Sequence, residues 1–360
     1  MPPRDGQARR HAKDVLCQRH IPFGLKDQHM RYRQLGSSTL QISEISLGSW
    51  LTFSGGVDFH RTRACTETAL DVGINFFDTA NAYGYGIAES AWGEILSEHP
   101  REKYVLATKL FAPMSKEPDD WGLTAQQIRK QLEASLQRLR TDYVDVYQAH
   151  RFDTRVPIEE TIEGFQSVVE QGKARYIGFS EWTPEQIRAG TEIGGDELFV
   201  ASQPQYSMLW RAPETEVFPL CQARAISQIV WSPLAQGVLT GKYRPAQRIP
   251  PGSRFASKTM GGSKDRYTDD VLKAVQRLAP IAEDAGMDMS TMALAWVLRR
   301  PEVASAITGA SRPEQVEANA RAAGVSLSAD LLARIDTALG SVPVTEPRLA
   351  VGAAEGVLHR

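Results

Sequence analysis

Four polar residues follow strand-like apolar runs and could together act on a carbonyl group. Asp78 ends the run GINFFD, Tyr83 follows it in DTANAY, Lys109 ends YVLATK and His150 follows VDVYQA. A phenol has an unperturbed pKa of about 10, but a nearby ammonium stabilises its phenolate and a carboxylate can hold that ammonium in place. An imidazole at the same spot can orient or polarise a carbonyl oxygen. The four residues therefore predict an acid, the group that tunes it, an anchor and an orienting group.

Eight short apolar runs alternate with amphipathic segments along the chain, and their continuous apolar character predicts parallel strands buried on both faces. The predicted strands are 45–49, 74–78, 104–109, 144–149, 174–179, 198–203, 225–231 and 303–309. Eight strand–helix units in series favour a (β/α)8 barrel over a doubly wound sheet. The absence of a GxGxxG run after any early strand also argues against a Rossmann fold.

Local signals support the intervening helices and an opening hairpin. The segment 124–140 carries an N-cap at Thr124 and one apolar stripe, at Ile128, Leu132, Leu136 and Leu139. Pro184 and Pro313 suit the first turn of a helix. The segment RYRQLGSSTLQIS predicts a hairpin before the first barrel strand. In a barrel the carboxyl ends of the strands gather at one face, so the four polar residues should converge there.

Several segments in order resemble the aldo-keto reductase superfamily, from Met30 through almost the whole chain. They are RYRQLGSSTLQISEISLGSW, DTANAYG, KARYIGFS, QYSML, WSPLAQGVLTGKY and ITGASRPEQ, with the strand-end Lys109 and His150. The resemblance is greatest to the branch of voltage-gated potassium channel beta subunits and their bacterial reductase relatives. It implies NADPH-dependent reduction of aldehydes and ketones, with Tyr83 as general acid, Lys109 lowering its pKa, Asp78 pairing with Lys109, and His150 orienting the carbonyl. The channel-subunit type commonly carries Asn at the position of His150.

The resemblance also implies the residues of the cofactor and substrate sites. Trp231 would stack on the nicotinamide, Ser180 and Gln203 would hold its carboxamide, and Trp50 would line the substrate mouth beside Tyr83 and His150, joined by Phe111 and Trp121. The other cofactor positions are Gly48, Ser49, Trp50 and Asp78 near the first strands, Ser232, Pro233, Leu234, Gly237, Lys242 and Arg254 for the pyrophosphate and ribose, and Gly309, Ser311, Arg312, Gln315 and Asn319 for the adenosine end. Two positions depart from the family pattern: Glu181 stands where Asn or Arg is common, and Ala318 replaces a Glu.

Taken without the resemblance, each of these residues also has an ordinary structural interpretation. Lys109 and Arg312 could be solvated surface charges, His150 a hydrogen-bonded structural histidine, Trp231 a core aromatic and Trp121 an exposed loop aromatic, and Tyr85 competes with Tyr83 as the acid.

The predicted domain boundaries follow from these patterns. Residues 1–29 are polar and basic and predict a disordered extension, 30–340 the barrel, and 341–360 a loose C-terminal tail. The stretch 240–269 is rich in Gly, Pro and Ser and predicts a long loop after the seventh barrel strand. Loops of that length usually carry function, and the resemblance implies a flap over the cofactor.

Composition limits the function classes. The 41 Lys and Arg against 43 Asp and Glu give a net charge of −2, which offers no basic surface for nucleic acid or an anionic membrane. No apolar run approaches the ~20 residues of a membrane span. Cys17, Cys65 and Cys221 are too scattered for a disulfide framework or metal site and fit a cytoplasmic protein.

Two functions other than the reductase are alternatives for this sequence. One is a redox-sensing regulatory subunit that binds NADP(H) and a protein partner but turns over slowly. The other, a metal-dependent barrel hydrolase, is disfavoured because no His or carboxylate pair has ligand spacing. The sequence leaves the carbonyl substrate, homo-oligomerisation and a protein partner undetermined.

Overall fold

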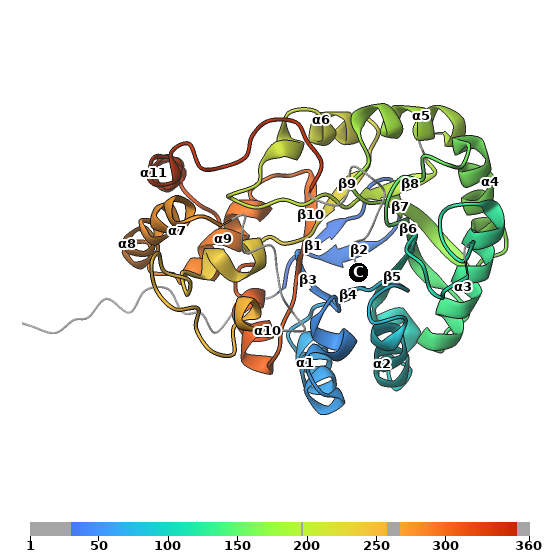
Figure 1. Cartoon of the computed structure of the whole chain (residues 1–360), viewed down its shortest axis with the longest axis horizontal. Helices are drawn as coiled ribbons and strands as arrows, with labels where there is room; N and C mark the ends of the chain where they lie inside the picture. The colour runs from blue at the N-terminus through green and yellow to red at the C-terminus, as the bar shows by residue number, and fades with distance from the viewer. Residues whose placement is uncertain (1–29, 118, 196, 258–266, 351–360) are drawn as a thin grey trace, which may run out of the picture.

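A closed barrel of parallel strands forms the centre of the computed structural model (Figure 1), which describes residues 30–117, 119–195, 197–257 and 267–350. Neighbours in sequence are neighbours in the barrel, and β10 closes it by pairing with both β9 and β3. The barrel strands are β3 (Ile45–Gly48), β4 (Phe76–Asp78), β5 (Val105–Leu110), β6 (Val144–Ala149), β7 (Ala174–Phe179), β8 (Phe199–Ser202), β9 (Ser227–Val230) and β10 (Val303–Thr308). Each lies in one of the eight predicted runs or extends one residue past it, which confirms the (β/α)8 barrel.

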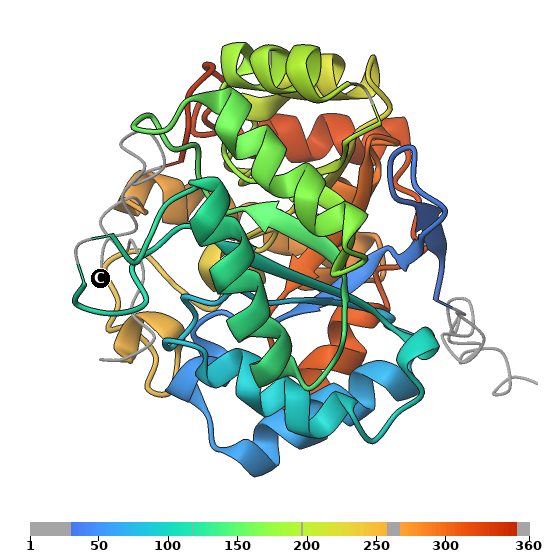
Figure 2. The same cartoon turned by 90° about the vertical axis from the view of Figure 1, so that its right-hand side faces the viewer.

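Helices surround the barrel, as Figures 1 and 2 show from two sides. Those of the described residues are α1 (Phe59–Asp71), α2 (Ile87–Leu96), α3 (Ala125–Leu139), α4 (Ile158–Glu170), α5 (Pro184–Gly194), α6 (Val217–Gln222), α7 (Asp269–Gln276), α8 (Leu278–Asp284), α9 (Met289–Leu298), α10 (Pro313–Ala320) and α11 (Ala329–Leu339). The predicted cap of α3 is present, because the Thr124 side chain accepts a hydrogen bond from the Gln127 amide. Pro184 and Pro313 begin α5 and α10, as predicted. None of the helices in these residues has the length and apolarity that crossing a membrane requires.

The predicted hairpin closes one end of the barrel. Strands β1 (Tyr32–Gln34) and β2 (Gln41–Ser43) pair antiparallel. Three buried residues of this hairpin pack against the interior of the barrel, including Phe76 and Val105. They are Leu35, Leu40 and Ile42. In Figure 2 the blue hairpin lies at the right-hand end of the barrel. The hairpin therefore completes the core at the end opposite the carboxyl ends of the strands.

Strand alternation positions the polar residues at the other end. Side chains two apart in a strand share a face, and Phe76, Val105 and Val146 all point into the barrel interior. The same face of β4 then carries Asp78 and that of β5 carries Lys109, two strand steps beyond Val105. On β6 it carries Gln148, which pairs with Lys109 in register. The interior is thus apolar at the hairpin end and polar at the carboxyl ends of the strands.

The predicted termini have different outcomes. The extension 1–29 lies outside the described residues, as does part of the predicted flap. The prediction of a loose tail is wrong for residues 341–350. The Val344 amide donates to the Leu209 carbonyl at 3.0 Å, and the Arg211 amide donates to the Val344 carbonyl at 2.7 Å. Order in this segment comes from pairing with a loop more than a hundred residues away, which local sequence pattern does not reveal.

Candidate active site

The Lys109 ammonium is the centre of the predicted four-residue site. Its side chain is fully buried, and Nζ donates to Asp78 Oδ2 at 2.6 Å, to the Thr79 carbonyl at 2.8 Å and to Tyr83 Oη at 3.3 Å. All three ammonium protons are therefore used, and one of them faces the phenol. The structure brings Asp78, Lys109 and Tyr83 together as the sequence predicted, with Thr79 contributing a carbonyl that sequence reasoning missed.

The Asp78 carboxylate is fully bonded on its other side as well. Its Oδ1 accepts from Gln203 Nε2 at 2.9 Å and from Gln148 Nε2 at 3.2 Å. A buried ion pair is sustained only when further hydrogen bonds satisfy its remaining atoms. Gln148 was not predicted. Its signal is positional, because it follows the apolar Val144 and Val146 on the strand face that leads to His150.

The Tyr83 phenol is half-buried and stays protonated well into alkaline pH. Burial has the largest effect on its pKa and raises it, the Lys109 charge and hydrogen bond act to lower it, and the net pKa is raised. Lys109 therefore acts in the predicted direction and lowers the pKa of the phenol, although burial outweighs it in the net shift. Burial likewise acts to lower the pKa of Lys109, but the charge of Asp78 and contacts with Tyr83 outweigh it and raise that pKa. Tyr85 is 62% exposed, so it is not the phenol that meets Lys109.

His150 lies edge-on to Tyr83, with ring centroids 5.6 Å apart and ring planes at 76°. The imidazole is 6% exposed. Burial, and then the charges of Arg151 and Lys109, hold its pKa well below the usual range, so the ring is neutral at physiological pH. Arg151 was not predicted. Its Nη1 donates to the His150 carbonyl at 2.5 Å, and its charge also lowers the pKa of Tyr83.

Of the predicted nicotinamide residues, Gln203 contacts the Asp78 carboxylate directly. Ser180 Oγ donates to the Gln203 carbonyl at 2.8 Å, while the side chain of Gln203 bonds Asp78. Trp231 follows β9, is half-buried and donates its indole N–H to Glu181 Oε1 at 3.0 Å. Glu181 thus has a defined structural role at the position that departs from the family pattern. Hydrogen bonds within the protein therefore hold the side chains of Ser180, Gln203 and Trp231 in place.

The loop after β9 has an unusual backbone. Ser232, Ala235 and Gln236 take positive φ angles of 54°, 48° and 58°, and Gly237 follows at 93°. Residues other than glycine rarely adopt this region, and such strain concentrates at binding and active sites. A Cβ at Gly237 would also come within 3.0 Å of Lys242 Cε. Pro233 is buried and Leu234 half-buried in the same turn.

Three cations border this loop. Arg254 lies with its guanidinium carbon 4.9 Å from the centre of the Trp50 ring. Burial lowers the Arg254 pKa to about 10, and its Nε and Nη2 are buried without a hydrogen-bond partner among the described residues. Partial burial and the charges of Arg312 and Arg254 lower the pKa of Lys242. Buried cationic donors without acceptors fit the phosphate groups of a dinucleotide.

The predicted adenosine end lies at the start of α10. Arg312 is the N-cap residue, its side chain is 66% exposed, and its Nε is 3.7 Å from Glu314. The Ser311 amide and hydroxyl both donate to Gln315 Oε1, at 2.8 and 3.1 Å. A Cβ at Gly309 would meet only Thr52 Oγ1, at 3.7 Å. The other predicted residue of this group is buried within α10, namely Asn319.

The remaining predicted residues divide between the mouth of the site and the core. Trp50 is 42% exposed and its ring centre lies 6.4 Å from that of Tyr83, so it borders the site. Ser49 Oγ donates a hydrogen bond to Thr79 Oγ1 at 2.8 Å. A Cβ at Gly48 would come within 2.6 Å of Ile307 Cγ2, so packing explains why this position is a glycine. Phe111 is only 3% exposed and packs edge-on against Trp121, so it does not line the mouth as predicted.

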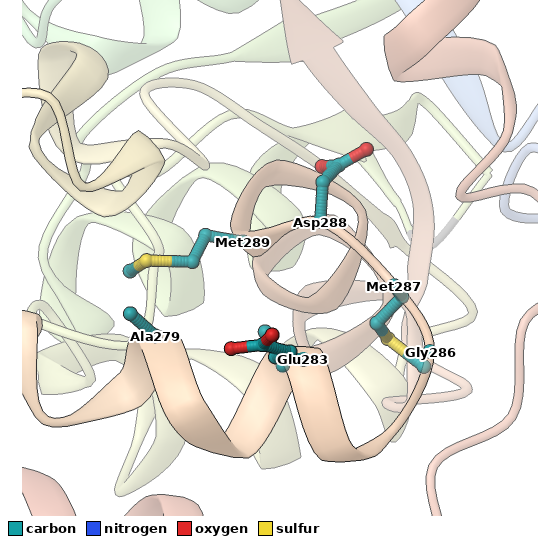
Figure 3. A pocket seen from close by; sticks show the side chains of 7 residues that line it. Ala279, Glu283, Gly286, Met287, Asp288 and Met289 are labelled. Carbon is teal, nitrogen blue, oxygen red and sulfur yellow. The ribbon is translucent and has the colours of Figure 1, made fainter.

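A surface hollow away from these residues lies between α8 and α9 (Figure 3). It has a volume of about 460 Å³ and its lining residues include Glu283, Met287, Asp288 and Met289. Asp288 caps α9 through the Thr291 amide and hydroxyl, so its carboxylate is already bonded. This hollow contributes no residue to the predicted four-residue site of Asp78, Tyr83, Lys109 and His150. The described residues contain no cluster of three or more His, Cys, Asp or Glu that could hold a metal ion.

Comparison with known proteins is consistent with this geometry. The chain is 40% identical over 326 residues, 87% of its length and 98% of the relative's, to a probable voltage-gated potassium channel subunit beta of Arabidopsis thaliana. It is 34% identical over 85% of its length, and 92% of the relative's, to the L-glyceraldehyde 3-phosphate reductase of Escherichia coli K12. An aldo-keto reductase from Bacillus halodurans, solved in its holo form, matches with a TM-score of 0.70 and 29% identity over 90% of this chain and 99% of that one. Residues 44–339 match the aldo/keto reductase family, and the chain belongs to that family.

Proposed function

We propose that this protein reduces aldehydes and ketones to alcohols with NADPH. The observation that carries the proposal is the hydrogen-bonded chain Asp78–Lys109–Tyr83, which ends beside a neutral His150. When bound, NADPH would supply the hydride, which no side chain can provide. The relatives support an oxidoreductase, since two of them are named as reductases.

The positions of the atoms support a role for each of the four residues. Tyr83 Oη gives its proton to the carbonyl oxygen as the carbonyl carbon is reduced. Lys109 stabilises the phenolate that forms, and Asp78 holds the ammonium in place. His150 orients the carbonyl oxygen as a neutral hydrogen-bonding group. Because the pKa of Tyr83 is raised, the phenol is protonated throughout the physiological pH range and holds the proton that it must donate.

Cofactor binding would use the remaining groups. Trp231 would stack on the nicotinamide, and Ser180 with Gln203 would hold its carboxamide. Ser232, Leu234, Gly237, Lys242 and Arg254 would contact the pyrophosphate and ribose. Ser311, Arg312 and Gln315, at the start of α10, would bind the 2′-phosphate, which favours NADPH over NADH. The unpartnered donors of Arg254 support a phosphate acceptor in this region.

A second function is favoured by the 40% identity to a probable potassium channel subunit beta. In that case the protein would bind NADP(H) and a protein partner and would turn over slowly. Steady-state NADPH oxidation with 4-nitrobenzaldehyde, methylglyoxal and a wider carbonyl panel distinguishes the two. We expect turnover of at least about 1 s⁻¹ on one compound for an enzyme. Tight NADPH binding with negligible turnover across the panel would contradict the reductase and support the regulatory function.

A further inference from the structure

Glu181 joins three separate segments of the chain beside the site. It follows β7, is 6% exposed and takes a left-handed φ of 56°. Its Oε1 accepts from the Gln205 amide at 2.6 Å and from Trp231 Nε1 at 3.0 Å. Its Oε2 accepts from the Ala350 amide at 2.9 Å. One buried carboxylate therefore connects the loop after β8, the indole after β9 and the C-terminal segment.

The C-terminal segment also belongs to the apolar cluster against which Trp231 packs. Ala350 is 1% exposed and forms a small apolar cluster with Trp210 and Ala212, against which Trp231 and Val344 pack. The Arg348 guanidinium lies 5.4 Å from the centre of the Trp210 ring. This segment is thus linked to Trp231 in two ways, by hydrogen bonds through Glu181 and by the apolar cluster that contains Ala350.

The charge on Glu181 also acts on Arg151. Burial lowers the pKa of Arg151, and the charge of Glu181 is the largest effect opposing it. Hydrogen bonds to an ionised acceptor are roughly twice as strong as neutral ones. All three donors are N–H groups, so only a group that accepts at both oxygens satisfies them. A carboxylate does so, whereas a carboxamide must present a donor at one of the two positions.

We propose that Glu181 is a positioning residue for the nicotinamide, which fixes the Trp231 ring by tying it to the C-terminal segment around Ala350. The proposal rests on the proposed function in one respect, the stacking of Trp231 on the nicotinamide. Residues 341–350 then form part of the cofactor site. Neither Glu181 nor Ala350 needs to touch the cofactor for this role, because both act through the orientation of the indole.

The first test is Glu181→Gln. Oε1 of the glutamine can still accept from Gln205 and Trp231, but its Nε2 faces the Ala350 amide, donor against donor. We expect the Kd values for NADPH and NADH to rise by the same factor, on the order of tenfold, because the nicotinamide is common to both. Binding of adenosine 2′,5′-bisphosphate, which has no nicotinamide, should be unchanged. Equal weakening of all three ligands would show a general structural role and overturn the proposal.

The second test removes the other end of the bond. Ala350→Pro deletes the amide that donates to Glu181, and Glu346→Pro is the matched control because Glu346 is exposed and its amide makes no hydrogen bond within the described chain. We expect Ala350→Pro to weaken NADPH binding as Glu181→Gln does, with the control unchanged. If Ala350→Pro binds NADPH like the control, the inference is wrong even if the enzyme reduces carbonyls. If the variants respond as expected but no carbonyl is reduced by the wild type, the reductase proposal fails and this inference stands.

Discussion

The buried ion pair between Lys109 and Asp78 sets the electrostatics of the individual site residues. Both side chains are almost fully shielded from solvent, and every proton of the ammonium has an acceptor. A charge in this position is tolerated only while its partner is present. The pair therefore contributes to stability and also holds the ammonium that contacts the Tyr83 phenol.

Removing one partner should be costly. We expect Lys109→Met to lower the free energy of unfolding by about 3–5 kcal/mol, because it leaves the Asp78 carboxylate buried without a counter-charge. Urea unfolding measures this loss. The double variant Lys109→Met/Asp78→Asn should recover part of it, since neither remaining side chain is charged. A single variant as stable as the wild type would contradict the buried pair.

His150 makes stability depend on pH. Its pKa is depressed in the folded protein, so below about pH 6.5 the unfolded state binds a proton that the folded state does not. Stability should therefore fall as the pH drops from 6.5 toward the folded pKa, by up to about 1.4 kcal/mol per pH unit for this one group. Urea unfolding at pH 7.5 and 5.5 tests it. His150→Asn should have a shallower pH dependence than the wild type, and an identical one would show that His150 titrates normally.

Single residues also show where sequence reasoning stops. Asp78, Tyr83, Lys109 and His150 could be predicted because each ends a strand or follows one closely, and barrel topology brings strand ends together. Glu181, Arg151 and Thr79 could not, because their roles depend on which backbone groups and charges face them in three dimensions. The direction in which Lys109 shifts the pKa of Tyr83 could be predicted, but the larger opposing effect of burial could not, because the degree of burial cannot be read from the local sequence.

At the scale of elements, we propose that the start of α10 sets the preference between the two nicotinamide dinucleotides. Arg312 is the N-cap residue of this helix, and its charge lowers the pKa of Lys242. A helix N-terminus favours an anion. The only chemical difference between NADPH and NADH is a phosphate, so the preference should depend on this element.

Arg312→Ala tests the preference. We expect the Kd for NADPH to rise about tenfold, the effect of losing one charge-assisted contact, while the Kd for NADH stays within twofold. Isothermal titration of both cofactors against wild type and variant measures the two effects. Equal weakening of both cofactors would show that Arg312 does not contact the 2′-phosphate.

Elements were predicted well where their own pattern specifies them. The eight barrel strands are continuously apolar, and α3 shows both its cap and its stripe in sequence. The C-terminal segment was mispredicted because its order depends on distant partners, Leu209, Arg211 and Glu181. Long-range backbone pairing and a single buried acceptor leave no periodicity in the sequence.

On the scale of the whole molecule, the hairpin core and the proposed active site lie at opposite ends of the barrel. The hairpin closes one end with Leu35, Leu40 and Ile42, and the four-residue site around Lys109 lies at the carboxyl ends of the strands. This division is common to barrels of this type. It predicts that stability and activity can be changed separately.

Ile42→Ala should separate them. Deleting this fully buried side chain should lower the free energy of unfolding by about 2–5 kcal/mol and leave kcat unchanged below the unfolding transition. Gln41→Ala, on the exposed neighbouring position of β2, is the control and should change stability by no more than about 0.5 kcal/mol. A fall in kcat with Ile42→Ala, measured where the variant is folded, would show that the two ends are coupled.

The most direct measurement of the central claim is NADPH oxidation by wild type and Tyr83→Phe on the same aldehyde, with the Kd for NADPH measured on both. Phenylalanine keeps the ring and removes only the hydroxyl that Lys109 contacts at 3.3 Å. We expect kcat to fall by about 10²–10⁴-fold, as the loss of a general acid implies, with cofactor binding unchanged. Full kcat in Tyr83→Phe would contradict Tyr83 as the acid and the mechanism built on it.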